Sequence, residues 1–545
     1  MAQSPAGIGP ATPEPSTWLL TARERGNPAT RLDDRHAGGE AWSAGNEVRP
    51  LVHGAAYFAE LVAQVRKLRA GDLLLFTDWR GDADERLAGD GCTVAEILCD
   101  AARHGVLVRG LVWRSHLDQF QFSERENRHL GEDIEAAGGK CLLDMRVRPG
   151  GSHHQKFVVL RHNGRPEEDV AFVGGIDLCH GRHDDAGHEG DPQAQPMAAT
   201  YGDRPPWHDL QLAIRGPAVG DVETVFRERW EDPAPLSRSP LHRLRARLRR
   251  EDTGAGPLPP QPPDPEPCGP HTVQLLRTYP NRRHGYVFAP DGERSVARSY
   301  LKALRRAASL IYLEDQYLWS PQVAAPFAEA LAARPGLHLI AVLPRFPDRD
   351  GRFSLPPNLL GHSLALTMLY RAGGDRVAIY GIENHDGTPV YVHAKACVID
   401  DVWASAGSDN FNRRSWTHDS ELSCVVLDET PDLRRPRTPG DNGQYARAYA
   451  RELRLTLSRE HLDRGLGDDA DLCDPRAAFT AFAESAAALD GWHAAGRPGR
   501  RPPGRLRAYQ TRELSWWTRA WATPLYRRMY DPDGRPPAMR RAGTF

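Results

Sequence analysis

The chain contains two copies of one sequence pattern, and this internal repeat constrains its fold more than any other feature. The stretch HHQKFVVL places a His-x-Lys pair, His154 and Lys156, at the start of an apolar run. The stretch VHAKACVID places His393 and Lys395 in the same way, 239 residues later. At 545 residues the chain also exceeds the usual size of a single core. We therefore expect two homologous lobes.

Other landmarks recur in the same order in both halves. A predicted helix leads to a buried strand that ends in an acid, Asp78 or Asp315, which lies 76 or 78 residues before the histidine. After each His-x-Lys strand come a turn and a glycine segment, and then the matching strands WHDLQLAIRGP and HDSELSCVVLD. The glycine segments are Gly174-Gly175 and Gly407-Ser408. Alternating helices and strands predict the α/β class, with one site shared by two lobes at a pseudo-twofold interface.

Changes in composition divide the chain into five segments. We expect a flexible N-terminal tail (1–45), a first lobe (46–240), a basic and Pro-rich linker (241–270), a second lobe (271–470) and a C-terminal extension (471–545). We interpret RLRARLRR in the linker as a solvated helix, with contact to anionic lipid as the alternative. We interpret ELSWWTRAWATPLYRRMY as a structural helix, with an interfacial segment as the alternative.

The charge pattern argues against nucleic acid as the partner. The formal net charge is −2, so no global field attracts a polyanion. Eight scattered cysteines form no C-x-x-C pair, and no apolar run approaches the roughly 18 residues that span a bilayer. We expect a monomeric, cytoplasmic protein without a leader peptide, with peripheral membrane contact. The acidic run DDAGHEGD (184–191) reads as a solvated loop rather than a metal site, because no ligand spacing stands out.

The two His-x-Lys pairs predict a composite phosphodiester site. Residues i and i+2 of a strand point the same way, so each histidine shares a face with its lysine. Only five of the 70 basic residues are lysine, which suggests that both places need a compact ammonium. The ammonium groups can neutralise phosphate oxygens, while one imidazole attacks phosphorus and the other protonates the leaving oxygen. No metal or cofactor is called for.

Each imidazole also needs an acid to orient it. The repeat nominates Asp209 and Glu421 at equivalent strand starts, and either acid can serve the histidine of its own lobe or of the other. Small polar residues that can complete a phosphate pocket are Asp177, Ser408 and Asn410. The glycines allow close backbone approach.

These residues resemble the phospholipase D superfamily, whose signature is H-x-K-x-x-x-x-D followed by a Gly-Gly or Gly-Ser segment. YVHAKACVIDD and GSDNFNRRSW look like the second catalytic segment of its eukaryotic-type branch, with Asp400 as the motif's aspartate. HHQKFVVL, GGIDLCHGRHD and PWHDLQLAIRGPAV look like the first segment and its continuation. The resemblance covers residues 48–459. It implies two α-β-α sandwich lobes, a phosphohistidine intermediate on His154, and His393 as general acid and base.

The resemblance also implies the substrate and the partners. The family hydrolyses a phospholipid at a membrane or micelle surface, or transfers the phosphatidyl group to a small alcohol in place of water. The sequence departs from the motif at Arg161, which stands where the first aspartate belongs. Strand alternation points position 161 away from the face of the histidine. Three alternatives stay open: a nucleic-acid phosphodiesterase, a transferase like cardiolipin synthase, and a catalytically weakened lipid- or phosphate-binding protein.

Overall fold

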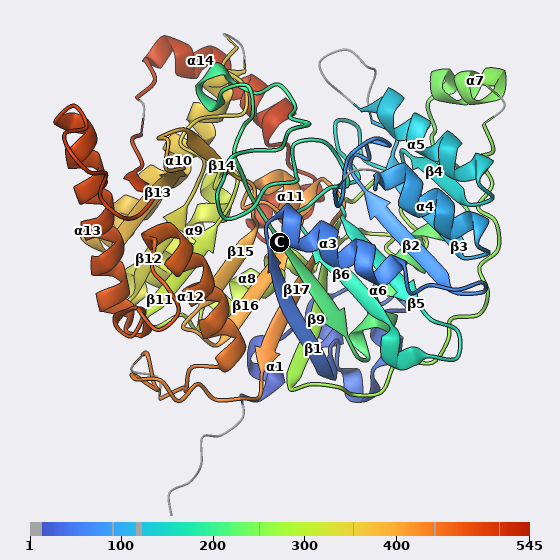
Figure 1. The fold of residues 1–545 in the computed structure, drawn as a ribbon, viewed down its shortest axis with the longest axis horizontal. Helices are drawn as coiled ribbons and strands as arrows, with labels where there is room; N and C mark the ends of the chain where they lie inside the picture. The colour runs from blue at the N-terminus through green and yellow to red at the C-terminus, as the bar shows by residue number, and fades with distance from the viewer. Residues whose placement is uncertain are drawn as a thin grey trace, which may run out of the picture.

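The fold consists of two similar lobes side by side, as the computed structural model in Figure 1 shows. The structure describes residues 13–89, 92–115, 123–249, 251–351, 354–440, 443–511 and 513–545. Each lobe is built on a mixed β-sheet whose central strands are apolar and buried on both sides. This pattern is expected of sheets covered by helices on both faces.

The first sheet has seven strands, and its parallel part lies at one edge. The order across the sheet is β1 (Ser43–Val52), β8 (Leu210–Arg215), β6 (Val170–Gly174), β5 (Phe157–Arg161), β2 (Leu73–Asp78), β3 (Leu107–Trp113) and β4 (Lys140–Asp144). Neighbours are antiparallel except along β2–β3–β4.

The second sheet repeats this topology strand for strand. Its order is β9 (His271–Tyr279), β17 (Glu421–Asp428), β16 (Trp403–Gly407), β15 (Ala396–Ile399), β11 (Leu310–Glu314), β12 (His338–Val342) and β13 (Val377–Glu383). Only β11–β12–β13 are parallel. The expected α/β class with two homologous lobes is therefore confirmed.

Two strands join the lobes through their backbones. The first residues of β1 pair with β9 of the second sheet, and residues 47–52 of the same strand pair with β8 of the first. Nearer the predicted site, β7 (Trp207–His208) of the first lobe runs parallel to β14 (Pro389–Val392) of the second. The two lobes thus share hydrogen-bonded ladders.

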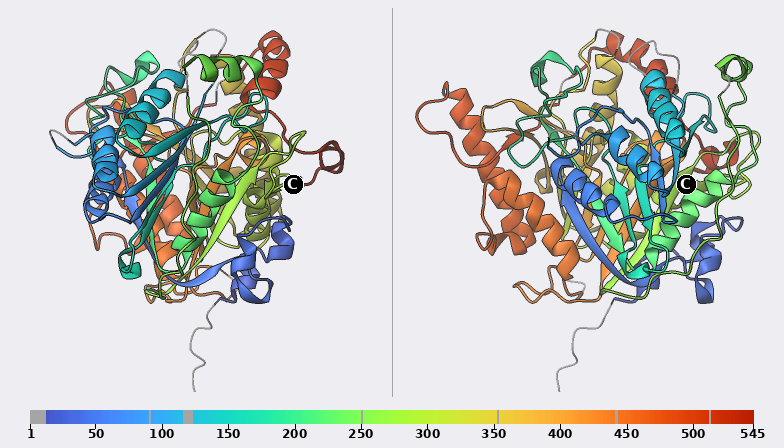
Figure 2. Two further views of the ribbon diagram at one scale, coloured as in Figure 1. Left: turned by 90° about the vertical axis from the view of Figure 1, so that its right-hand side faces the viewer. Right: turned by 45° about the vertical axis from the view of Figure 1, so that its right-hand side comes forward.

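Helices cover both faces of the sheets. The outer faces pack on α3 (Gly54–Val65), α4 (Val94–Arg103) and α5 (Glu124–Ala136) in the first lobe, and on α8 (Ser295–Leu304), α9 (Pro321–Ala333) and α10 (Leu355–Gly373) in the second. The inner faces share one large core with α6 (Ala218–Trp230), α12 (Ala448–Leu462) and α13 (Pro475–Ala494). Figure 2 shows these layers from two further directions.

Two expectations from the sequence need correction. Within 13–45, part of the expected flexible tail is packed: Trp18 of α1 (Pro15–Trp18) is fully buried in the core of the second lobe, and Arg25 forms a buried ion pair with Glu293. The acidic run 184–191 is only partly solvated, because Asp184, His188 and Asp191 are at most 5% exposed whereas residues 185–187 and Glu189 are exposed. The side chains of these three residues bond the loop to its surroundings. Such contacts cannot be read from the sequence, where a hydrophilic stretch predicts a solvated loop.

The linker and the extension contain regular structure of their own. The basic stretch forms α7 (Pro240–Arg249) as predicted. In the extension, β18 (Leu506–Ala508) adds an antiparallel strand to β13, and α14 (Trp516–Leu525) packs on α10. None of the helices in the described ranges is long and apolar enough to traverse a lipid bilayer.

Candidate active site

The two His-x-Lys segments meet at the boundary between the lobes in matching backbone settings. His154 and Lys156 lead into β5, and His393 and Lys395 lead into β15. The amide of His154 donates to the carbonyl of Ser420 in the other lobe at 2.9 Å. The amide of His393 donates in the same way to the carbonyl of His208 at 2.7 Å. Each segment is therefore positioned by the opposite lobe.

The imidazole rings are oriented by acids from the opposite lobe as well. Nδ1 of His154 lies 2.9 Å from Oε2 of Glu421, and Nδ1 of His393 lies 2.6 Å from Oδ2 of Asp209. The sequence left the pairing open, and the structure has the crossed arrangement. In the described part of the chain Nε2 of neither histidine has a hydrogen-bond partner. Each ring is thus held at one nitrogen and presents the other to a substrate.

Ser408 stabilises one of these acids. Its hydroxyl donates to Oε2 of Glu421 at 2.6 Å, and its carbonyl lies 3.1 Å from Nδ1 of His154. We expected this residue to contact phosphate, and its hydroxyl is instead committed to Glu421. Asn410 retains a buried Oδ1 without a hydrogen bond, so its side chain remains available for a ligand.

The two lysines are buried and held close to their histidines. Nζ of Lys156 donates to the carbonyl of His154 at 3.1 Å and lies 3.5 Å from Oδ1 of Asp177. Nζ of Lys395 donates to the carbonyl of His393 and lies 3.4 Å from Oε1 of Gln316. Burial lowers the pKa of Lys395 to about 8, although the carboxylates of Asp209 and Asp315 oppose this.

In the half of the site that contains His393, burial and nearby charges favour a neutral imidazole beside an ionised Asp209. Burial, followed by the charge of Lys395, lowers the pKa of His393 to about 3 against the opposing effect of Asp209. For Asp209, burial acts to raise the pKa, but His393 and Lys395 outweigh it and bring the pKa to about 2. An anion bound between the lysines would offset their charge and raise the pKa of His393.

A second pair of acids lies beneath the lysines, at the strand ends that mark the repeat. Burial and the neighbouring Asp177 raise the pKa of Asp78 far above its usual value. Asp177 itself stays ionised because Lys156 and the hydrogen bond from Asp78 outweigh its burial and lower its pKa. In the other lobe, burial raises the pKa of Asp315 to about 6. The sequence marked Asp78 and Asp315 as landmarks only.

Sequence reasoning missed the aromatic wall of the site. The ring of Trp207 lies 4.8 Å from the ring of His393, centre to centre, and its Nε1 donates to Asp209 at 3.3 Å. The guanidinium of Arg182 lies over the ring of Trp207 at 3.9 Å from its centre and reaches Asp177 at 3.9 Å. Trp79 lies edge-on to His154 at 6.4 Å. Trp207 and Arg182 adjoin predicted residues, but neither has a counterpart in the other half of the repeat.

The glycines of the motif are required by close approach of neighbouring strands. A Cβ at Gly175 would overlap the carboxylate of Asp209, and one at Gly174 would overlap the backbone of β8. A Cβ at Gly407 would overlap Ser423 on β17. These contacts agree with the expected role of the glycines in close backbone approach.

Arg161 contacts the linker and α6 instead of the histidines. Its guanidinium lies 3.2 Å from Asp169 and 3.3 Å from Glu223, and it donates to the carbonyl of Pro263 at 2.6 Å. In the second lobe, Asp400 accepts from the amides of Ala308, Ser309 and Leu310, which lead into β11.

The first lobe makes the same strand connection with a carboxylate from the opposite strand. Asp72, which precedes β2, accepts from the amide of Asn163 just beyond β5 at 2.8 Å. The connection that Asp400 provides in the second lobe therefore persists in the first. Arg161 changes a structural contact and does not touch His154 or Lys156.

A buried network of histidines and glutamates lies behind Asp209. Glu460 of α12 contacts His53, His188 and His208 at 2.7, 3.0 and 3.2 Å. Glu314 bonds His208 and His461, each at 2.7 Å. The ligand atoms of His53, His188, His208 and Glu460 lie within 4.8 Å of one another, as do those of His208, Glu314 and His461, so either group could hold a metal ion. In the structure their own hydrogen bonds already join the two lobes beside the site.

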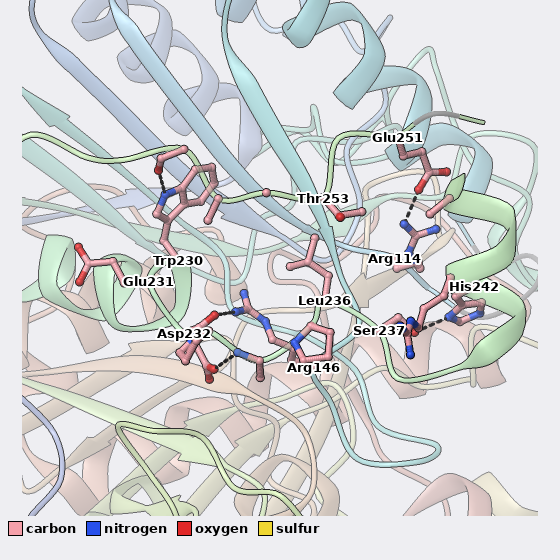
Figure 3. A pocket seen from close by; sticks show the side chains of 18 of the residues that line it. Arg114, Arg146, Trp230, Glu231, Asp232, Leu236, Ser237, His242, Glu251 and Thr253 are labelled. Carbon is pink, nitrogen blue, oxygen red and sulfur yellow. Dashed lines mark hydrogen bonds and ion pairs between the residues drawn. The ribbon is translucent and has the colours of Figure 1, made fainter. Parts of the chain in front are cut away.

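Two of the cavities have linings that include neither His154 nor His393. The first, of about 790 Å³, is enclosed between the first lobe and the linker; Figure 3 shows Arg114 bonded to Glu251 and His242 bonded to Ser237 at its wall. The second, of about 580 Å³, is strongly basic. Its lining is Arg148, Gln322, Arg413, His418, Arg527, Arg528, Pro532, Asp533 and Arg540.

Fold and site together define a class of proteins in which duplicated α/β lobes share one composite His-Lys site. The family model described as "Phospholipase D" matches residues 73–325, and the one described as "Cardiolipin synthase, PLD-like domain" matches residues 364–434. The chain belongs to the phospholipase D superfamily.

Similar proteins include phospholipases D of plants. "Phospholipase D alpha 1" of Oryza sativa subsp. japonica is 26% identical, with 71% of this chain and 60% of that protein covered. "Phospholipase D alpha 1" of Vigna unguiculata is 30% identical, with 70% and 60% covered. A solved phosphatidylserine synthase of Haemophilus influenzae Rd KW20 has 13% identity and a TM-score of 0.48, with 71% of this chain and 84% of that chain covered. The chain spans about 60% of the length of the curated relatives that it matches.

Proposed function

We propose that the chain is a phospholipase D-type phosphodiesterase that hydrolyses a glycerophospholipid or transfers its phosphatidyl group to an alcohol. The observation that carries this proposal is the pair of crossed His–carboxylate contacts, each beside a buried lysine. Two oriented imidazoles with free Nε2 atoms are what a double displacement at phosphorus needs. No step requires a further group.

In the first step, Nε2 of His154 attacks phosphorus and the bond to the oxygen of the head group breaks. Nε2–H of His393 donates its proton to that oxygen, and the head-group alcohol leaves. The product is a phosphatidyl group bonded to His154. Lys156 and Lys395 neutralise the charge that develops on the other phosphate oxygens.

In the second step, water or a small alcohol approaches from the side that the head group has left. Nε2 of His393, now neutral, accepts its proton as the oxygen attacks phosphorus and the bond to His154 breaks. The product is phosphatidate or a phosphatidyl alcohol, and His393 is protonated again. Glu421 and Asp209 keep each ring in the tautomer that this cycle needs.

The protonation of His393 depends on the substrate. The low pKa of this ring leaves it neutral in the empty site at neutral pH. A phosphodiester anion between the two lysines supplies the negative charge that favours the imidazolium. The assignment of His154 as nucleophile rests on the resemblance, since the structure gives both rings equivalent contacts.

The comparisons support a lipid substrate, and one of them favours a transfer reaction as second candidate. The plant relatives are named phospholipases D. The second lobe matches a model described as cardiolipin synthase-like. Phosphatidylglycerol supplied as the accepting alcohol would then yield a lipid with two phosphatidyl groups, by the same two steps.

Mixed phospholipids incubated with the purified protein, a short alcohol and EDTA test the proposal. We expect phosphatidate and phosphatidyl alcohol, and their loss in His154→Ala and His393→Ala. Glu132→Gln on the surface of α5, where the side chain is 63% exposed, is the matched control and should retain activity. Turnover that survives both histidine substitutions would refute the two-lobe mechanism. Cleavage of DNA without lipid turnover would refute the lipid assignment.

Trapping of the intermediate identifies the nucleophile. In a His393→Asn variant the second step lacks its base, so acid-labile phosphate should accumulate on the protein. We expect it on His154, located by mass spectrometry of peptides prepared at neutral pH. Label on His393 in the reciprocal His154→Asn variant, together with no label on His154 in the His393→Asn variant, would reverse the two roles.

A further inference from the structure

The segment that begins with α14 exposes large apolar side chains beside arginines. Ala522 and Tyr526 bury one face of the segment against Trp319 and Leu360. The side chains of Trp516, Trp517 and Met529 are 64%, 67% and 64% exposed. Between Leu514 and Tyr530 the sequence contains three arginines and no acid. Tryptophan and arginine side by side on an exposed face are typical of segments that lie in a membrane interface.

Helix α7 has the same character at the other lobe. Leu241, Leu244 and Leu248 occupy one face at helical spacing and are 47%, 54% and 76% exposed. Four arginines of this helix alternate with them, and the helix contains no acid. The leucines pack on nothing in the described part of the molecule that would explain their spacing, whereas a bilayer surface would bury them.

Both helices lie at the same end of the molecule. Figure 1 shows α14 above the second lobe and α7 above the first, and both views of Figure 2 keep the two helices (red and green) at this end. The basic cavity adjoins the π-helix that continues α14, Tyr526–Tyr530, through Arg527 and Arg528.

The same cavity is lined by a residue close in sequence to a backbone contact of His154. His418 lines the cavity, and two residues further on the carbonyl of Ser420 accepts the amide of His154. The basic cavity beside α14 thus adjoins a segment that positions His154.

We propose that α7 and α14 form a docking face for an anionic lipid bilayer. Trp516, Trp517 and the three leucines enter the interface, and the arginines of both segments contact lipid phosphates. Attachment at two points on different lobes holds the approach to His154 against the bilayer. This inference rests on the proposed function in one respect, which is that the substrate is a membrane lipid. Binding of the protein to the bilayer itself requires no turnover.

Flotation with vesicles of phosphatidylcholine, with and without phosphatidylglycerol, tests the docking face. We expect the His154→Ala protein to bind vesicles that contain phosphatidylglycerol, and its affinity to fall as salt rises. Trp516→Ser with Trp517→Ser should weaken binding at least ~10-fold, and so should Leu244→Ser with Leu248→Ser, because interfacial binding scales with the apolar area buried. Arg243→Gln and Arg247→Gln should each cost about fivefold, at roughly 1 kcal/mol per arginine.

Leu466→Ser is the matched control, since Leu466 is 88% exposed and belongs to neither helix. This variant should bind as the unaltered chain does. In an otherwise unaltered chain, the tryptophan and leucine variants should turn over a short-chain lipid below its micellar concentration at the normal rate and vesicles more slowly. Comparison of the two rates separates membrane binding from catalysis, and a normal rate on the short-chain lipid shows that the variants fold. Vesicle binding unchanged in both double variants, or equal for neutral and anionic vesicles, would overturn the proposal.

Discussion

Each half of the candidate site depends on one carboxylate that reaches across the lobe boundary. Glu421 holds the ring of His154, and Asp209 holds that of His393. Such an acid fixes the tautomer in which Nε2 faces the substrate, and it stabilises the imidazolium that forms during proton transfer. At the scale of single residues, the proposed chemistry depends on these two contacts.

We expect Asp209→Asn and Glu421→Gln each to lower kcat by about 10⁴, as loss of an orienting acid does in a catalytic triad, with little change in KM. An amide of the same shape can present N–H to Nδ1, which reverses the tautomer. Steady-state turnover of a phospholipid measures the effect, and Glu132→Gln provides the surface control. A loss below tenfold in both variants would contradict the orienting role.

The buried lysine of the second half-site gives a pH dependence. The pKa of Lys395 is about 8, so its ammonium is present below that pH in the free protein and is lost above it. We therefore expect kcat/KM to fall along an alkaline limb near pH 8. In Lys395→Arg the charge persists at high pH, because the guanidinium does not titrate there. The residual activity of that variant should show no limb near pH 8, and an unchanged limb would assign it to another group.

At the scale of elements, the first motif has a positively charged residue where the motif's aspartate belongs, and the contacts around that position differ accordingly. Arg161, at the end of β5, ties that strand to α6 and to the linker. Asp72 meanwhile takes over the strand connection that Asp400 provides in the second lobe. The arginine is thus part of a local arrangement that differs between the lobes.

Restoring the motif's aspartate should therefore harm the protein. In Arg161→Asp, Asp169 and Glu223 each lose a cationic partner, although Glu223 keeps Arg227, and both face a third carboxylate in a buried setting. We expect the free energy of unfolding to fall by about 3–5 kcal/mol, as when one partner of a buried ion pair is removed. Urea unfolding measures this free energy, and Arg103→Met, at an exposed position of α4, is the control. A variant as stable as the parent, with higher turnover, would show that Arg161 does impair the site.

At the scale of the whole molecule, the network around Glu460 ties the lobes together beside the site. Glu460 lies on α12 of the second lobe, and its three histidine partners come from the first. Burial disfavours charge on His208, yet Glu314 and Glu460 raise its pKa to about 10. Glu460 therefore forms buried ion pairs with His188 and His208 across the lobe interface, whereas burial lowers the pKa of His53.

We expect Glu460→Gln to lower the stability of the whole chain by about 3 kcal/mol, because His188 and His208 each lose one carboxylate partner while they remain buried. Circular dichroism during urea unfolding should show one transition at a lower midpoint. Glu484→Gln on the exposed face of α13 serves as control and should leave the midpoint in place. An unchanged midpoint for Glu460→Gln would mean that the interface does not depend on this network.

Much of the architecture was predictable because it is repeated in the sequence. The two His-x-Lys segments and the glycine segments marked equivalent strands, and the structure has the same strand order in both sheets. The crossed pairing was not predictable, since sequence gives the order of elements and not which lobe an acid faces. Arg182 and Trp207 lack counterparts in the repeat. The histidines of the Glu460 network are scattered at 53, 188 and 208, so no spacing marked them.

The double pairing of β1 has a consequence for how a substrate enters. Because β1 forms backbone hydrogen bonds with both sheets, a hinge motion that moves the two lobes apart would have to break the backbone hydrogen bonds of β1. A ligand that enters the candidate site would therefore do so without such a hinge motion of the lobes. Amides of β1 should accordingly be among the slowest in the chain to exchange with deuterium, whether or not turnover is under way.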